Sequence, residues 1–265
     1  MNKISFKISV PFWIDDDEEK TFEESTRLRN VNFVEIELQK MVTYLKERGL
    51  DISYEIYDFS PVKMFNKATH IPFPLGEFRK CEKWNKVIER TNETYFIGLD
   101  CDCFVHQSDY DKLYELLLTA TGDEVFLFNT KFIYETDVDN IDFENHNLDN
   151  LLEIPIHYCY TYGFVGSFGG LWICPTSFLK AAGGFNENLK FRGHEDGEAL
   201  DRVYNYIHKN PTSQTEDGVR HRSVNRILDF LPFHIPHKYQ TSDSRYKNEA
   251  KNTLDGGDWK PRTDW

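Results

Sequence analysis

The first sixty residues carry the pattern that most constrains the fold, which is a strand, a long helix and a second strand. Residues 3–12 alternate apolar and polar side chains, as a half-buried strand does. Apolar residues then recur at helical spacing over residues 26–48, and Gly49 ends the helix. Residues 52–58 form a second strand that ends in Asp58. Two strands joined by one helix pair in parallel by default, so the sequence predicts an α/β fold with a mostly parallel sheet flanked by helices.

Residues 96–105 are an apolar run, expected to be a buried strand, that ends in Asp100 and Asp102. Ligands of open α/β sheets bind beyond the carboxyl ends of the strands, where this carboxylate pair is expected. Carboxylate oxygens suit Mg2+ or Mn2+, and these ions hold substrate phosphates. The alternative is a strand followed by an acidic turn. Cys101 and Cys103 have no second Cys or His pair nearby, so we interpret them as packing residues rather than zinc ligands.

Composition limits the kinds of partner that the chain can bind and the number of domains that it can form. A net charge of −13 over 265 residues argues against a nucleic acid or an anionic membrane as the main partner. Five irregularly spaced cysteines suggest reduced thiols and a cytoplasmic protein. No run of 18 apolar residues is present, so we expect no transmembrane segment, and peripheral work at the inner face of a membrane stays open. We expect one domain over residues 1–252, with a mobile loop at 210–222, and a tail over 253–265.

Two predicted helices begin with charged residues. Lys80 stands near the start of a helix over residues 78–90, where backbone N–H groups favour anions, so it is either a phosphate ligand or an exposed charge. Glu195 and Asp196 head a helix that runs to residue 208. Neighbours on a helix point about 100° apart, so one carboxylate could hold a substrate hydroxyl while the other takes its proton. The structural alternative is that the helix dipole favours acids in a first turn.

Two further features lie in the second half of the chain. Gly169 and Gly170 precede a short apolar strand and allow close approach of the backbone to a neighbour. Residues 228–233 are expected to be a strand that delivers His234, with His237 three residues on. An imidazole can complete an ion site begun by carboxylates, and a purely structural histidine is the alternative.

Taken together, these features resemble the metal-dependent glycosyltransferases of the GT-A fold, from about Lys3 to Asn252. The chain is most similar to the group that contains β-1,4-galactosyltransferases, polypeptide N-acetylgalactosaminyltransferases and bacterial capsule-type transferases. The residues that carry the resemblance are Val10-Pro11-Phe12 with Arg27-Leu28-Arg29-Asn30, Asp58, Lys80 with Asn85, Asp100-Cys101-Asp102, Gly169-Gly170, Gly183-Gly184-Phe185-Asn186-Glu187, Glu195-Asp196 with Glu198 and Arg202, and His234. Arg192 replaces a Trp that the family often has, which makes a charged acceptor group possible, and Gly197 replaces an acid.

The resemblance implies a nucleotide-binding half over residues 1–105 and an acceptor-binding half over 106–252. It implies transfer of a sugar from a nucleotide-diphosphate donor, with a UDP-sugar as first candidate, to a hydroxyl of a carbohydrate or glycoconjugate, with inversion and with Mn2+ or Mg2+. The implied general base is Asp196, and the implied acceptor residues are Glu195, Gly169, Gly170 and Arg192. The implied donor residues are Pro11, Asp58, Lys80, Asn85 and Asp100. The implied metal ligands are Asp102 and His234, with Asp100 supporting them and His237 as the alternative to His234. A sugar nucleotidyltransferase and a catalytically silent sugar-binding protein are the alternative functions.

Overall fold

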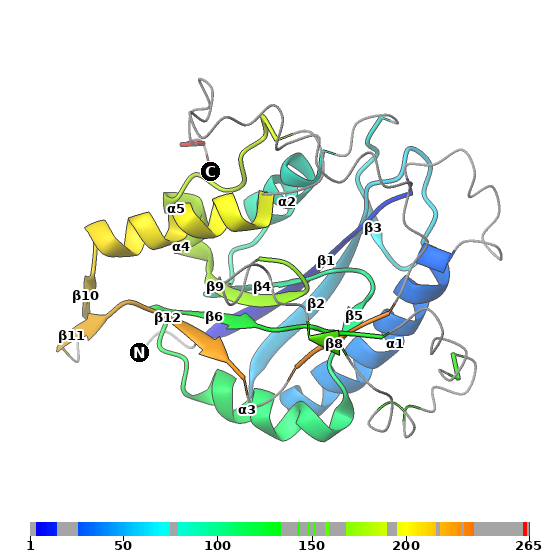
Figure 1. Cartoon of the computed structure of the whole chain (residues 1–265), viewed down its shortest axis with the longest axis horizontal. Coiled ribbons are helices and arrows are strands. Elements are labelled where there is room, and N and C mark those ends of the chain that lie inside the picture. Colours follow the sequence, from blue (N-terminus) through cyan, green and yellow to red (C-terminus); the bar gives the residue numbers. More distant parts are fainter. Residues whose placement is uncertain are drawn as a thin grey trace.

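A seven-stranded sheet forms the middle layer of the computed structural model, with helices on both faces (Figure 1). The structure describes residues 4–14, 26–74, 79–133, 142–143, 148, 151, 157–158, 168–189, 195–215, 218–228, 231–235, 262–263 and 265. The strands of this sheet, in spatial order, are β12 (Ser223–Ile227), β6 (Glu124–Phe128), β9 (Leu171–Pro175), β4 (Tyr95–Leu99), β1 (Ser5–Phe12), β2 (Asp51–Asp58) and β3 (Thr69–His70). Only β9 runs antiparallel to its neighbours, so the prediction of a mostly parallel sheet is confirmed.

Two hydrophobic cores fill the space between the sheet and the helices. α1 (Thr26–Glu47) and α3 (Tyr110–Leu118) pack on one face, and α2 (Lys80–Glu89), α4 (Thr176–Ala181) and α5 (Glu195–Lys209) pack on the other (Figure 1). Strand side chains alternate between the two cores, because successive residues of a strand point to opposite faces. In β4, for example, Ile97 belongs to the first core and Phe96 to the second. Among the described helices, none combines the length and the apolar character that crossing a membrane requires.

Gly98 lies in the middle of β4 because a tryptophan occupies the place of its side chain. It is paired with Trp172 of the antiparallel strand β9. A Cβ at Gly98 would lie 2.1 Å from a carbon of the Trp172 ring. The indole in turn stacks on Phe96 and Phe168, with ring centroids 5.1 and 4.4 Å apart. The glycine therefore serves the packing of the sheet, and it brings β9 and the residues before it against the end of β4.

A second, four-stranded sheet lies beyond the end of β4. Its strands, in spatial order, are β5 (Cys103–Phe104), β13 (Phe233–His234), β7 (Lys131–Phe132) and β8 (His157–Tyr158). The strand predicted over residues 96–105 is therefore interrupted, since β4 ends at Leu99 and a turn precedes β5. The single strand predicted over 228–233 is wrong, because β12 ends at Ile227 and β13 begins at Phe233. Pro232, which has no N–H to donate, precedes β13 and accepts from Lys131 N.

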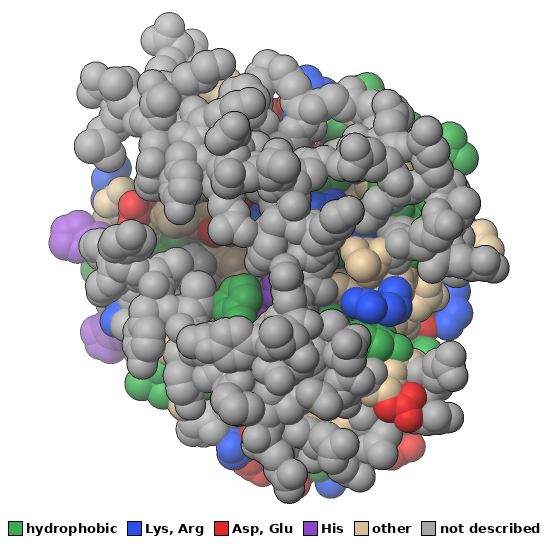
Figure 2. All heavy atoms as spheres, turned by 45° about the vertical axis from the view of Figure 1, so that its right-hand side comes forward, with side chains coloured by type: hydrophobic (Ala, Val, Ile, Leu, Met, Phe, Trp, Pro, Cys, Tyr) green, Lys and Arg blue, Asp and Glu red, His purple; other side chains and the backbone are tan. Residues whose placement is uncertain are grey.

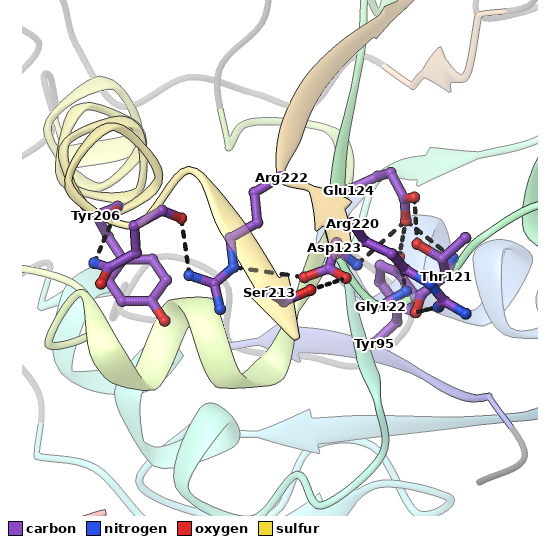
Figure 3. Close-up of polar contacts among 10 residues, drawn as sticks. Tyr95, Thr121, Gly122, Asp123, Glu124, Tyr206, Ser213, Arg220 and Arg222 are labelled. Carbon is purple, nitrogen blue, oxygen red and sulfur yellow. Dashed lines mark hydrogen bonds and ion pairs between the residues drawn. The ribbon is translucent and has the colours of Figure 1, made fainter. Parts of the chain in front are cut away.

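The mobile loop predicted over 210–222 is also wrong, because most of it is a hairpin of β10 (Thr212–Thr215) and β11 (Gly218–His221). Figure 3 shows how side chains attach this hairpin to the start of β6. Asp123 accepts from Ser213 Oγ at 2.7 Å, and Arg222 Nε lies 3.5 Å from its other oxygen. Arg220 donates to the carbonyl of Thr121 at 3.0 Å. These polar residues form strands because they have partners just before β6, at Thr121 and Asp123, which the local sequence does not reveal.

The last described residues return to the domain. Trp265 packs against the second core, and the guanidinium of Arg262 lies 4.9 Å from the centre of its ring. A Cβ at Gly184 would lie 2.5 Å from that indole. The division of the chain into a domain and a tail stays a prediction.

Candidate active site

The turn after β4 holds the first carboxylate of the predicted site. Asp100 exchanges two hydrogen bonds with Gly170, since its backbone N–H donates to the Gly170 carbonyl and its Oδ2 accepts from Gly170 N, each at 2.9 Å. Gly170 has a φ of +73°, and a Cβ there would lie 2.3 Å from Thr130 Oγ1. The position thus requires glycine. Gly170 orients Asp100, while the predicted contact of Gly169 and Gly170 with an acceptor stays a prediction.

Asp102 and His234 are brought together by pairing of β5 with β13. His234 is the antiparallel partner of Cys103, and Ile235 N donates to the carbonyl of Asp102 at 2.8 Å. His234 Nε2 lies 3.5 Å from Asp102 Oδ2. Both side chains are about nine-tenths buried. The structure therefore joins two predicted metal ligands that are 132 positions apart in the chain.

Within the described residues, one group could hold a metal ion, and it consists of Asp102, Cys103 and His234. One ligand atom from each residue lies within 4.8 Å of the others. A carboxylate, an imidazole and a thiol are all ligands of divalent ions of the first transition row. The chemistry of this set therefore fits a divalent ion. Cys103, interpreted from the sequence as a packing residue, is buried as expected and also belongs to this group.

The first turns of α2 and α5 meet in a buried cluster of charges, and Figure 1 shows the start of α5 beside α2. Lys80 Nζ donates to Asp196 Oδ2 at 2.9 Å and lies 3.7 Å from Glu195 Oε1. The side chains of Lys80 and Glu195 are 10% and 8% exposed, and that of Asp196 is 21% exposed. An exposed charge, the alternative for Lys80, would not be buried. Helix-dipole capping, the alternative for Glu195 and Asp196, does not by itself account for the burial of the two acids either.

Most other ion pairs in the described residues lie at the surface. On the face in Figure 2, the described acidic and basic side chains lie in small separate groups. The pair of Lys86 with Glu89 is typical, since the two side chains are 45% and 41% exposed. Such pairs contribute only about 0–1 kcal/mol to stability. The Lys80 cluster differs because its charges are withdrawn from water, where electrostatic interactions are stronger.

Burial and neighbouring charges alter proton binding in this cluster. The pKa of Asp196 is raised to about 7, chiefly by burial, with Glu195 and Asp100 adding to the rise and Lys80 opposing it. Burial disfavours the charged form of Lys80, but the carboxylates outweigh it and raise the pKa of that lysine well above its ordinary value. Burial also raises the pKa of Asp100, with Asp102 adding to the shift and Lys80 opposing it. Charges therefore interact in sequence from the Asp102–Cys103–His234 group, through Asp100, to Asp196.

Two polar residues of the buried cluster have oxygens without hydrogen-bond partners among the described residues. These atoms are Asp196 Oδ1 and Glu195 Oε2, which are both buried. The second oxygen of each carboxylate faces Lys80. A buried polar atom without a partner costs about 1–3 kcal/mol, so it needs an explanation. The arrangement can accept two hydrogen bonds from a ligand at the start of α5.

The other predicted donor residues are held by the chain itself. Asp58 is fully buried, and its carboxylate accepts from the backbone N–H groups of Ser60, Met64 and Phe65 at 2.6–2.9 Å. Pro11 is buried in β1 beside β2. Neither residue's contact with a nucleotide is tested by these interactions, and both stay predictions.

Asn85 is likewise fully buried and braces the loop after α4. Its Nδ2 donates to Phe185 O at 2.8 Å and to Glu187 Oε1 at 2.7 Å, and its Oδ1 accepts from Phe185 N at 2.7 Å. Both amide hydrogens are therefore used within the protein. Arg192 and His237 lie outside the described residues.

Sequence reasoning named candidate residues but missed how the structure combines them. Lys80 was expected near donor phosphates, and its ion pair with Asp196 joins residues 116 positions apart, for which the local sequence holds no signal. Thr130, which faces Gly170, was not identified at all. Cys103 could have been found from its position next to Asp102, since a thiol beside a ligand carboxylate can reach the same ion.

The comparisons with known proteins are structural. No protein-family model matches the chain, and no curated protein matches it by sequence. Among solved structures, the chain is similar to the catalytic domain of Drosophila β1,4-galactosyltransferase 7 in complex with xylobiose, at 15% identity and a TM-score of 0.50, covering 94% of this chain and 81% of that one. It also matches residues 1–349 of S. aureus TarS in complex with UDP-GlcNAc, at 11% identity and a TM-score of 0.49, covering 89% of this chain and 60% of that one. The chain thus has the GT-A glycosyltransferase fold that its sequence predicted.

Proposed function

We propose that the chain is a metal-dependent glycosyltransferase. It would move a sugar from a nucleotide-diphosphate donor, with a UDP-sugar as first candidate, to a hydroxyl of a carbohydrate such as a growing glycan, with inversion at the anomeric carbon. The fold supports this proposal at the level of architecture only. The observation that carries it is the buried pair Asp196–Lys80, with a carboxylate oxygen that no described residue uses, in electrostatic contact with a group of residues that could hold a divalent ion.

In the proposed reaction Asp196 is the general base. Its Oδ2 is bound by Lys80 and its Oδ1 has no hydrogen-bond partner among the described residues, so Oδ1 is the atom that takes the proton. The acceptor oxygen forms a bond to the anomeric carbon, the bond from that carbon to the diphosphate breaks, and the hydroxyl proton passes to Asp196. A pKa of about 7 suits a base that works near neutral pH, since it can be ionised before the step and still bind a proton firmly.

Glu195 and Lys80 would position the reacting groups. Glu195 Oε2 can accept a hydrogen bond from an acceptor hydroxyl, because no described residue uses it. Lys80 fixes the orientation of Asp196 and favours its ionised form. We assign Lys80 to this role rather than to the donor phosphates, and Asn85 to positioning the loop at Phe185. Arg192, Gly169 and Gly170 stay candidates for the acceptor side.

Asp102 and His234 would hold the ion, Mn2+ or Mg2+, with Asp100 supporting them and His237 as the alternative imidazole. When bound, such an ion neutralises charge on a departing diphosphate. The nucleotide would lie at the carboxyl ends of β1, β2 and β4, where Pro11, Asp58 and Asp100 are found.

The test is the product formed from a panel of nucleotide-diphosphate sugars. We expect the chain to release a nucleoside diphosphate in the presence of Mn2+ and to stop when the metal is removed by a chelator. Asp196→Asn should lower kcat by about 10²–10⁴-fold, the usual contribution of a general base. Asp201→Asn is the matched control, because Asp201 is an exposed carboxylate on the same helix.

The outcomes separate the alternatives. Formation of pyrophosphate from a nucleoside triphosphate and a sugar phosphate would identify a nucleotidyltransferase instead. Binding of a nucleotide sugar without turnover would identify a silent binding protein. Full activity in Asp196→Asn would leave the transferase but remove Asp196 as its base.

A further inference from the structure

We propose that Cys103 is a third protein ligand of the metal ion, so that the site binds the ion through one oxygen, one nitrogen and one sulfur atom. This inference rests on the proposed function only in that the ion takes part in sugar transfer. It adds a ligand that the expected carboxylate and imidazole set does not contain, and it predicts which ions the site prefers.

The backbone brings the thiol to the site. Cys103 opens β5 and is the direct antiparallel partner of His234 in β13. Residues directly opposite in an antiparallel pair have Cβ atoms about 4.5–5.5 Å apart and project to the same face of the sheet. Asp102 lies in the turn before β5, so the direction of its side chain is not set by the alternation of side chains along a strand. All three side chains can therefore point at one position.

The distances in the group are those of ligands before an ion draws them together. Cys103 Sγ lies 3.7 Å from Asp102 Oδ1, and His234 Nε2 lies 3.5 Å from Asp102 Oδ2. A sulfur and a nitrogen bound at about 2.3 and 2.1 Å can be at most about 4.4 Å apart across an ion. Around a tetrahedral ion this separation is about 3.6 Å, so ligand atoms within 4.8 Å of one another need to shift by at most about 1.2 Å.

The surroundings of Cys103 also favour a bound ion. The residue is fully buried, and its thiol donates to the carboxylate of Asp102. When an ion binds, the sulfur–metal bond replaces the S–H bond and the proton leaves to solvent, with no change of oxidation state.

The sulfur ligand has a consequence for ion choice. Thiolates select soft and borderline ions, whereas Mg2+ takes oxygen ligands in near-ideal octahedral geometry. The site should therefore bind Co2+, Zn2+ and Cd2+ more tightly than Mn2+, and Mn2+ more tightly than Mg2+.

The test is the absorption spectrum of the chain loaded with Co2+. We expect a sulfur-to-cobalt charge-transfer band in the wild type, its loss in Cys103→Ser and its retention in Cys101→Ser. Cys101 is the matched control because it flanks Asp102 on the other side and is not part of the ligand group. In Cys103→Ser, Cd2+ affinity measured by calorimetry should fall at least about 10-fold, the lower end of the cost of disturbing a metal site's outer shell. Mg2+ affinity should change less.

A second measurement does not depend on any variant folding. X-ray absorption of the zinc-loaded wild type should show one sulfur at about 2.3 Å from the ion. Any one of three results would overturn the proposal: an ion surrounded by nitrogen and oxygen only, the absence of a charge-transfer band in the wild type, or a band that survives in Cys103→Ser. If sulfur binds the ion but no sugar is transferred, the proposed function fails alone. If sugar transfer occurs with a sulfur-free ion, this inference fails alone.

Discussion

Two buried carboxylate oxygen atoms distinguish the candidate site from the rest of the described chain. Asp196 Oδ1 and Glu195 Oε2 are buried and have no hydrogen-bond partner among the described residues. A fold loses stability by keeping such atoms, and strained or unsatisfied groups that persist are concentrated at functional sites. Lys80 compensates only in part, because its one ammonium group faces both carboxylates from one side. The remaining oxygens are therefore able to accept hydrogen bonds from a ligand.

The role of Lys80 can be tested by the pH dependence of the reaction. A base must be ionised to act, so kcat/KM should rise with pH through the pKa of Asp196, which is about 7. Lys80→Met removes the positive charge that favours the carboxylate, while Glu195, Asp100 and the Cys81 thiol still face the cluster. The pKa should increase, and the acidic limb of the pH–rate profile should move upward by about 1–3 pH units.

The control for this variant is Lys86→Met, because Lys86 lies on the same helix and its side chain is 45% exposed. Its pH–rate profile should match that of the wild type. A Lys80→Met enzyme that is slower at every pH with an unmoved acidic limb would show that the lysine acts only on structure.

Residue types were predictable from the sequence, but their partners were not. The acids at the start of α5 and the lysine at the start of α2 were each noted as candidates. Their ion pair requires two helix ends to meet, which depends on the packing of α2 and α5 against the second core. Asp102 and His234 were each noted as possible ion ligands, but Cys103 entered the group only because β5 pairs with β13.

At the scale of elements, the pairing of β4 with β9 decides where the site lies. β9 is the antiparallel member of the sheet, and Gly98 leaves room in β4 for the ring of Trp172. The residues before β9 then reach the end of β4, where Gly170 holds Asp100. A packing contact in the second core thus determines the position of a carboxylate at the edge of the sheet.

We predict opposite effects of two Gly→Ala substitutions on stability. Gly98→Ala places a methyl group against the Trp172 ring, and overpacking of this kind costs about 1–3 kcal/mol or more. Gly197→Ala meets nothing within 4 Å on α5, where alanine is favoured over glycine by about 0.5–1 kcal/mol. Urea unfolding would measure both changes, and equal midpoints for the two variants would contradict this account of β4.

Elements with a strong local period were predicted well, and elements that depend on distant partners were not. The apolar period of α1 and the alternation in β1 are local properties, and both elements lie where the sequence placed them. The β10–β11 hairpin is polar, and it is held by Arg220 and Arg222 on residues near the start of β6. Two-residue strands such as β5 and β13 are too short to carry a period of their own.

At the scale of the whole molecule, strand order brings the parts of the site to one edge. β4 ends at the carboxylate turn, α2 and α5 begin beside it, and β13 delivers His234 next to β5. The fold class followed from the strand–helix–strand pattern. The position of β9 between β4 and β6 did not, because antiparallel insertion of a late strand leaves no local mark on the sequence.

In the proposed reaction, Asp196 activates a hydroxyl for direct displacement at the anomeric carbon of a nucleotide sugar. The most direct measurement is proton NMR of the sugar first released when the chain hydrolyses an α-linked nucleotide-diphosphate sugar with Mn2+, recorded before mutarotation. We predict the β anomer from the wild type and from Asp201→Asn, and little release from Asp196→Asn. Release of the α anomer by the wild type would contradict the account.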